Sequence, residues 1–450
     1  MTSLGVRPQE TRSPEKIAPA AQVPAGAPDV LDLSLQATSL LFVNAETTQQ
    51  TVAAGKRIAE GLGHRATVIP RWGELLVQVE TEQGQRAEAS AVAPMAIDMN
   101  KVLEAERVVD GLADGRLRAE EARGALRSVA ALPPVSLGRF VLAAAVGACA
   151  LAVVFGAERA STFPLIAVSA GTGALLRRGL SRLSPNPFLQ PFAAALLAGL
   201  IGGLGRRYQL GSAMTLIALT PCMVLVPGPH FLNGLIDLVR ARVALGSARL
   251  LFAGLVSAAI SAGLLLGLWL VGATLPITPP SRAIPLAVDA LAAGFAVAAY
   301  CSFYSMHWRY VPIPVLVGMA AHALRWSALA AGFSAFGAAF LACLLVGAVM
   351  SAVAARLRLP FAALSFAAVV SLIPGVFLFR MAAGSVQLAQ LGTRASDGVV
   401  STILSDGATA ILILLAMGFG LILPRLVAER FRPVGARGPA VHGGEHDHHD

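Results

Sequence analysis

Long apolar stretches, separated only by short arginine-bearing loops, fill this chain after Pro133-Pro134 and constrain its fold more than any other feature. A helix needs about 20 mostly apolar residues to cross the hydrocarbon core of a bilayer. Of the 450 residues, 56% are hydrophobic and only 14% are charged. A soluble domain has about a quarter of its residues charged. We therefore expect a polytopic, mainly α-helical membrane protein and exclude a wholly soluble one.

The apolar stretches predict about ten membrane spans, divided into two halves over residues 135–275 and 276–430. The second predicted span, Phe163–Leu176, is short enough to be re-entrant. The predicted spans are Phe140–Gly156, Phe163–Leu176, Phe188–Leu204, Ala213–Val226, Leu250–Val271, Ile284–Phe303, Pro314–Ala330, Phe333–Ala354, Phe361–Phe379 and Val399–Leu423.

A more polar segment, residues 30–134, precedes the spans and has the pattern of a compact α+β domain. Apolar positions at helical spacing predict four helices, and alternating positions predict three strands between them. The expected helices are Leu31–Val43, Thr48–Leu62, Ile97–Leu112 and Ala119–Ala131, and the expected strands are Ala66–Ile69, Leu75–Val79 and Ala87–Val92. Residues 1–29 and the His/Asp-rich residues 431–450 have too little apolar material to fold and are expected to be disordered.

The net charge of +9 does not indicate a nucleic-acid partner, because the arginines are spread over short loops that face lipid headgroups. Their excess on one set of loops places both termini in the cytoplasm. The four cysteines, Cys149, Cys222, Cys301 and Cys343, lie inside apolar stretches and are interpreted as buried hydrophobic residues. We expect no disulfide framework, metal site or cofactor. The sequence leaves open whether the chain forms a homo-oligomer.

The two apolar halves resemble each other. In each, a small-residue stretch ends in arginines, and a later span runs into a Pro-Gly break, Pro227-Gly228 in the first half and Pro374-Gly375 in the second. An odd number of spans per half would invert the second half relative to the first. Inverted repeats with broken helices at matching positions indicate the binding site of a secondary transporter, although few residue types are used and the likeness can arise by chance.

The break at Pro227-Gly228 is followed by polar side chains at helical spacing. Freed backbone groups are tolerated in a membrane only against protein or a polar cavity. His230, Asn233 and Asp237 follow at i, i+3 and i+7 and share one helix face. We interpret this face as part of a substrate or proton site; the alternative is an ordinary Pro-Gly helix end followed by an amphipathic interfacial helix.

The second half offers a cation and two acids. Arg380, just after Pro374-Gly375, is suited to hold a substrate carboxylate, or it reaches to the membrane interface as a snorkelling side chain. Asp289 and Asp406 lie within predicted spans, where a charge costs about 2.5–3.5 kcal/mol and is by default a functional hypothesis. Together with Asp237 they are the candidate proton-coupling residues. His307 and His322 are weaker candidates for a proton relay.

The N-terminal domain carries no nucleophile–base pair, CxxC motif or phosphate loop. Asn44 and Glu46, between the first two expected helices, fit a helix cap. We expect no catalytic residues and no enzyme. The competing hypotheses of other classes are a membrane-anchored hydrolase with its active site in this domain, and a regulatory domain fused to a channel.

The order of these features resembles the bacterial threonine/serine exporter family in its fused, two-half form. The matching stretches are Leu41–Leu62, Asp98–Leu126, Leu225–Leu250 and Leu372–Arg380. The resemblance implies a multi-pass protein of the bacterial plasma (inner) membrane. It also implies proton-driven efflux of threonine or serine without ATP. A dicarboxylate such as succinate is the alternative substrate, because some relatives with separate halves are associated with succinate export.

On this hypothesis the substrate binds between the halves, and one half rocks against the other to alternate access. The expected substrate-binding residues are Pro227, Gly228, His230, Asn233, Pro374, Gly375 and Arg380. The expected partners are a small polar solute, protons and the lipid bilayer.

Overall fold

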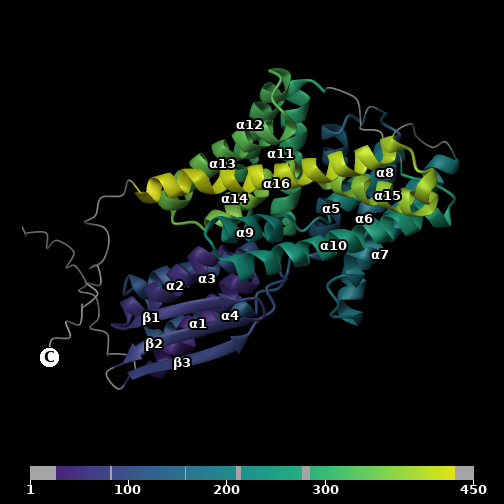
Figure 1. Cartoon of the computed structure of the whole chain (residues 1–450). Helices are drawn as coiled ribbons and strands as arrows, with labels where there is room; N and C mark the ends of the chain where they lie inside the picture. Colours follow the sequence, from purple (N-terminus) through teal and green to yellow (C-terminus); the bar gives the residue numbers. More distant parts are fainter. Residues whose placement is uncertain (1–26, 82–83, 158, 209–213, 276–283, 431–450) are drawn as a thin grey trace, which may run out of the picture.

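The chain forms an N-terminal α+β domain packed against a body of long apolar helices (Figure 1). The computed structural model describes residues 27–81, 84–157, 159–208, 214–275 and 284–430. The tails that the sequence predicts to be disordered lie almost wholly outside the described residues. The first helix starts at Ala27, inside the predicted N-terminal tail.

The N-terminal domain contains the four helices and three strands that the sequence predicts, with small shifts at their ends. The helices are α1 (Ala27–Val43), α2 (Thr48–Gly61), α3 (Met99–Ala113) and α4 (Ala119–Ala130), and the strands are β1 (Arg65–Arg71), β2 (Glu74–Thr81) and β3 (Gly84–Ala91). The strands form an antiparallel sheet in the order β1-β2-β3. Leu75, Val77 and Val79 are fully buried on one face of β2, as alternation predicts.

The α1–α2 loop departs from the expected cap. Thr47, not Asn44, caps α2, since its side chain accepts a hydrogen bond from the Gln50 N–H. Asn44 instead donates from its side chain to the Leu40 carbonyl at the end of α1, 2.8 Å away. Ala45 has a φ of 70°, so the loop turns sharply there. Glu46 is consequently directed inward and is fully buried.

The membrane body consists of helices joined mostly by short turns. The helices of the first half are α5 (Leu137–Val154), α6 (Thr162–Leu183), α7 (Leu189–Arg207), α8 (Met214–Met223), α9 (Gly228–Val239) and α10 (Val243–Leu270). Those of the second half are α11 (Leu286–Phe303), α12 (Pro312–Ala330), α13 (Ala335–Leu357), α14 (Phe361–Val369), α15 (Gly375–Leu391) and α16 (Asp397–Arg430), with short 3-10 turns η1 (Trp308–Tyr310), η2 (Val370–Leu372) and η3 (Gly392–Arg394).

The structure gives fewer clear spans than the ten predicted. Among the described residues, six helices are long and apolar enough to cross a membrane, or eight if each bent pair is one span. The difference arises in the first half. The α6 helix has Arg177, Arg178 and Arg182 in its last turns, and the apolar part of α7, Leu189–Gly205, is shorter than the long spans.

Within each half, one pair of helices is in especially close contact. The α7 and α10 helices pack along one another, as do α13 and α16. Each pair meets through glycines: a Cβ at Gly267 would lie 2.9 Å from the Leu200 nitrogen, and a Cβ at Gly420 would lie 2.8 Å from the Phe340 carbonyl oxygen. Small residues at such interfaces let two helix backbones approach closely.

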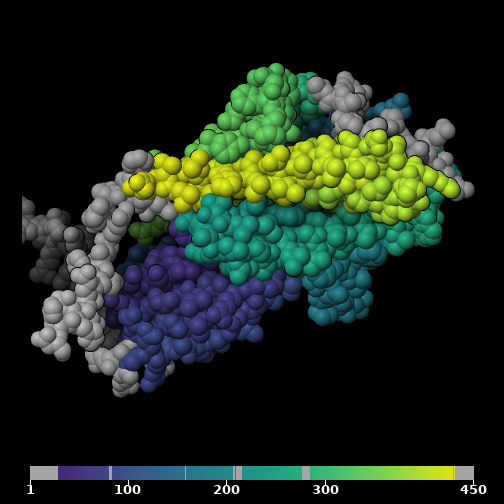
Figure 2. All heavy atoms as spheres, viewed as in Figure 1, coloured from purple at the N-terminus to yellow at the C-terminus, as the bar shows by residue number. Residues whose placement is uncertain are grey.

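The N-terminal domain packs on one end of the body, which we call the domain side; the opposite end is the far side. The Met99 N–H donates to the Tyr304 carbonyl just after α11, at 2.7 Å. The Arg358 side chain after α13 donates to Asp114 at 2.8 Å. Figure 2 shows the domain, in purple, against the teal helices, with α16 in yellow running along the body. The first residues of α11 and α16 therefore lie toward the far side.

Candidate functional site

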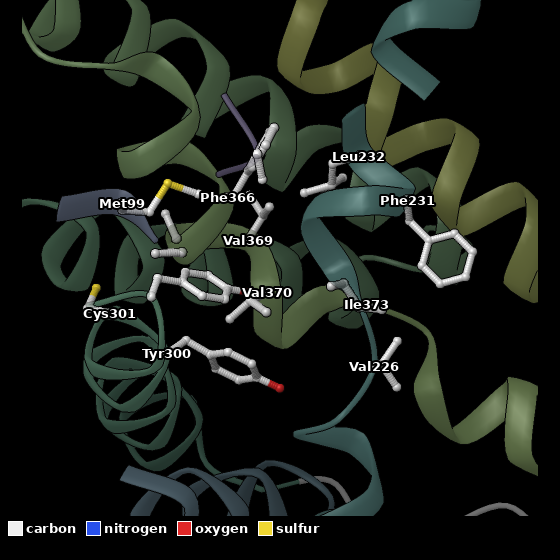
Figure 3. Close-up of a cluster of buried hydrophobic side chains, with 14 of the residues drawn as sticks. Met99, Val226, Phe231, Leu232, Tyr300, Cys301, Phe366, Val369, Val370 and Ile373 are labelled. Carbon is white, nitrogen blue, oxygen red and sulfur yellow. The ribbon is translucent and has the colours of Figure 1, made fainter. Parts of the chain in front are cut away.

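Two helix breaks meet inside the membrane body. The α8–α9 pair bends by 57° and the α14–α15 pair by 52°. A Cβ at Gly375 would lie 3.3 Å from Met223 Cγ and 3.5 Å from Val226 Cγ2, and a Cβ at Gly228 would overlap Ile373. Figure 3 shows Val226 of the first break in the same cluster of buried apolar side chains as Val370 and Ile373 of the second. Each break is therefore the packing partner of the other, and their contact is apolar.

A cavity of about 520 Å³ lies beside the first break, toward the domain side. Ligand pockets typically measure about 300–1,000 Å³. The break itself supplies Val224 to Pro227 to the wall, and Met95 to Ile97 of the N-terminal domain contribute as well. The remaining polar lining is provided by Arg177, Arg178, Ser181, Gln190, His230, Tyr300 and Tyr304. The cavity thus joins a broken helix, a basic helix end and the N-terminal domain.

Two arginines give this cavity its charge. Arg177 and Arg178 stand on α6, with their guanidinium groups 5.7 Å and 4.6 Å from the centre of the Phe140 ring. Arg178 donates to the Val135 carbonyl at 2.7 Å, whereas the buried Nε of Arg177 has no hydrogen-bond partner among the described residues. No acidic residue lines the cavity among the described residues. The arrangement is suited to an anionic group such as a carboxylate.

The predicted polar face of α9 is buried, but its members meet different neighbours. His230 lines the cavity and packs edge-on against Phe252, with ring centres 5.0 Å apart. Asn233 donates from its side chain to the Ala45 carbonyl at 2.9 Å. Asp237 accepts a hydrogen bond from the Thr48 hydroxyl at 2.9 Å. The face therefore begins at the cavity and continues as the docking surface for the α1–α2 loop.

Asp237 is also the centre of a buried charge cluster. Arg249 of α10 lies 3.2 Å from one carboxylate oxygen and Arg242 lies 3.3 Å from the other. The Arg249 guanidinium stacks 5.1 Å from the centre of the Phe42 ring of α1. These contacts join α9, α10 and the N-terminal domain at one point on the domain side.

Arg380 and Asp406 form a buried ion pair in the second half. Arg380 Nε lies 3.2 Å from an Asp406 carboxylate oxygen, and both side chains are buried. Arg380 stands on the helix after the second break, and Asp406 stands on the helix that follows. Neither residue lines the cavity.

Asp289 belongs to a third buried group. His322 of α12 contacts an Asp289 carboxylate oxygen through Nδ1 at 3.1 Å and the Ser371 hydroxyl through Nε2 at 2.8 Å. All three residues are at most 5% exposed. Ser371 lies in η2, three residues before Pro374.

Sequence patterns gave the breaks and the α9 face, but not the cavity arginines. Arg177 and Arg178 directly follow the predicted span Phe163–Leu176, and the sequence indicates only that they belong to the loop arginines that face lipid headgroups. Tyr300 lies in an apolar span, and its hydroxyl donates to the Met223 carbonyl at 3.2 Å, next to the first break. No sequence spacing links α6, α9 and α11, because the cavity arises from tertiary packing alone.

The fold and cavity define a class: a multi-pass helical membrane protein with a cavity of ligand size beside a broken helix. Two family models match in tandem, one described as "Putative threonine/serine exporter" over residues 32–271 and one as "Threonine/Serine exporter, ThrE" over residues 289–427. The chain belongs to the threonine/serine exporter family.

A curated relative agrees with this assignment. A protein of Mycobacterium tuberculosis (strain ATCC 25618 / H37Rv), named "Probable threonine/serine exporter", is 23% identical over 420 residues, covering 90% of this chain and 77% of the relative. No solved structure matches this chain. The family models and this relative confirm, over both halves of the chain, the family that the sequence resembles.

Proposed function

We propose that this chain is a secondary active exporter of small hydroxy amino acids, threonine or serine, driven by proton entry. It acts in the bacterial inner membrane with both termini in the cytoplasm. The observation that carries the proposal is the cavity, which is of ligand size, basic, and bounded by a broken helix. Membership of an exporter family supports the direction of transport.

The cavity side chains suit an amino acid. Arg177 has a free Nε to receive the substrate carboxylate, and His230 with Pro227 forms the wall at the start of α9. Gly228, Pro374 and Gly375 form the apolar junction that the substrate must pass. Asn233 and Arg380 lie outside the cavity, and in this proposal they hold the helices that follow the breaks.

The two halves are proposed to be inverted repeats that rock against each other. Their helices pack in matching pairs, with α5 on α11 at the shared interface. In each half a buried ion pair joins the helix after the break to the next long helix: Asp237 with Arg249 in the first, Arg380 with Asp406 in the second. The first pair lies on the domain side and the second on the far side, as inversion requires.

The substrate assignment is tested by export of labelled threonine from loaded cells. We expect Arg177→Gln to lower export about tenfold or more, because losing a charge-assisted contact to a carboxylate costs about 1.5–3 kcal/mol. Arg182→Gln is the matched control, since Arg182 is an exposed arginine on the same helix that does not line the cavity. Equal export by both variants at equal membrane abundance would contradict the assignment.

A dicarboxylate is the second candidate substrate, and one observation favours it. Two arginines, not one, line the cavity, and two carboxylates would use both. Competition decides between the candidates: excess cytoplasmic succinate should leave threonine export unchanged if the hydroxy amino acid is the substrate. Strong inhibition by succinate would move the assignment to dicarboxylates.

A further inference from the structure

The Asp289–His322–Ser371 group lies on the opposite side of the breaks from the substrate cavity. Asp289 is the fourth residue of α11, and the other end of that helix contacts the N-terminal domain through Tyr304. At 1.5 Å per residue, about 21 Å of helix separates Asp289 from Phe303. The cavity uses Tyr300 and Tyr304 at the domain end, so the group is directed to the far side.

We propose that His322 is the residue that binds the coupling proton, arriving from the far side, and that Ser371 conveys its protonation to the second helix break. The inference rests on the proposed function. It names a histidine as the proton acceptor, with Asp289 as its counter-ion, in place of a lone aspartate.

The charge of the Asp289 counter-ion determines which nitrogen of the neutral ring donates. An ionised Asp289 only accepts, so His322 Nδ1 carries the ring hydrogen and donates it to the carboxylate. Nε2 then has a free lone pair and accepts from the Ser371 hydroxyl at 2.8 Å. A histidine oriented in this way by a carboxylate is poised to gain a second proton at Nε2.

Protonation reverses one of these bonds. When a proton from water on the far side binds Nε2, the imidazole becomes an imidazolium and its charge is balanced by Asp289. The Ser371 hydroxyl must then accept from Nε2–H, so it has to turn its own hydrogen to another acceptor. Ser371 lies in η2, the last turn before the bend between Leu372 and Gly375. The change in charge therefore acts at the break that seals the path.

Few other charges face this group. Arg325, one turn after His322 on α12, is the further charged residue that interacts with both Asp289 and His322. The sequences of α14 and η2 contain no ionisable residue, and the charges of α13 lie at its domain-side end. With His322 neutral, Arg325 is the charged residue that balances Asp289 among the residues that the structure describes. With His322 protonated, the group gains one positive charge.

The test compares two activities of the full-length chain in cells loaded with labelled threonine. Exchange against external unlabelled threonine needs the substrate cavity but no net proton movement. Net efflux driven by an acid exterior needs both the substrate cavity and proton movement. If one proton enters for each threonine that leaves, a pH difference of about one unit corresponds to about a tenfold ratio of threonine concentrations. We expect His322→Gln to keep exchange within about twofold of the unaltered chain and to lose the response to external pH.

Two further variants complete the design. Asp289→Asn, of nearly the same shape, should behave like His322→Gln, because the imidazolium loses its counter-ion. His307→Gln is the control, since His307 is an exposed histidine near the domain side, and both of its activities should match those of the unaltered chain.

Each remaining outcome overturns the proposal. A full response to external pH in His322→Gln would show that the proton binds elsewhere. Loss of exchange in both His322→Gln and Asp289→Asn would show that the group supports the substrate site or the fold and does not carry the proton. If the unaltered chain exchanged no threonine, the substrate assignment itself would fail. That result differs from threonine exchange with no response to external pH, which concerns the proton site alone.

Discussion

At the residue scale, the most unusual environment in the N-terminal domain is that of Glu46. One carboxylate oxygen accepts from the Thr47 backbone N–H at 2.7 Å, and the other is buried without a hydrogen-bond partner among the described residues. Burial first, and repulsion from Glu106 second, raises the pKa of Glu46 to about 7. This carboxyl sits in the loop that docks on α9, so its protonation state bears on the docking.

This raised pKa makes stability depend on pH in a definite direction. The folded protein holds the Glu46 proton up to about pH 7, whereas an unfolded chain releases it near 4.5. The folded state therefore binds more protons between these values, and its stability falls as the pH rises through this window, by about 3 kcal/mol in all. We expect Glu46→Gln to flatten this slope in thermal unfolding of the purified protein between pH 5 and pH 8.

The matched control is Glu88→Gln on exposed strand β3, which should leave the slope unchanged. A slope in Glu46→Gln as steep as that of the unaltered chain would assign the pH dependence to other groups. Glu106 is the first of these, because burial also raises its pKa, although Arg57 opposes the shift.

The polar residues of α9 show how much local sequence patterns can predict. Helical spacing placed His230, Asn233 and Asp237 on one face of α9 without any structure. It could not say what that face meets. Asn233 and Asp237 contact Ala45 and Thr48, about 190 residues earlier in the chain, and no local rule encodes such a pairing.

At the scale of elements, the ends of the helices and the two breaks follow from local chemistry. Proline has no backbone N–H, so Pro227 and Pro374 interrupt the helical hydrogen bonding at these two points, and the bends lie there. The α6 helix was underestimated, because it continues to Leu183 through three arginines that the apolar pattern treats as a loop. The α6 helix as a whole packs against α5, α7 and α8.

The glycine contact between α7 and α10 gives a test of the helix packing. A Cβ at Gly267 would overlap the Leu196 carbonyl, which is backbone and cannot move aside cheaply, whereas a Cβ at Gly254 on the same helix meets nothing. We expect Gly267→Val to destabilise the protein by about 1–3 kcal/mol through overpacking. Gly254→Val should change the unfolding temperature in detergent little. Equal effects of the two variants would contradict the close α7–α10 approach.

At the scale of the whole molecule, the structure joins three features along one path. The basic cavity lies on the domain side, the two breaks meet behind it, and the Asp289–His322–Ser371 group lies beyond them. The first feature faces the N-terminal domain, and the contact between the breaks is closed by apolar side chains (Figure 3). This is the arrangement expected of a carrier open to one side only, whose central contact must separate for transport.

The central claim, that the two breaks part during transport, is tested most directly by tying them together. Val226 and Gly375 lie in contact across the breaks, with a Cβ at Gly375 3.5 Å from Val226 Cγ2. The measurement is threonine efflux in a chain carrying Val226→Cys and Gly375→Cys, with Cys149, Cys222, Cys301 and Cys343 replaced. A short, reducible thiol cross-linker is added to join the two introduced cysteines, and the cross-link is then cleaved by reduction. We expect the cross-link to stop efflux and reduction to restore it; unimpaired efflux by the fully cross-linked protein would contradict the account.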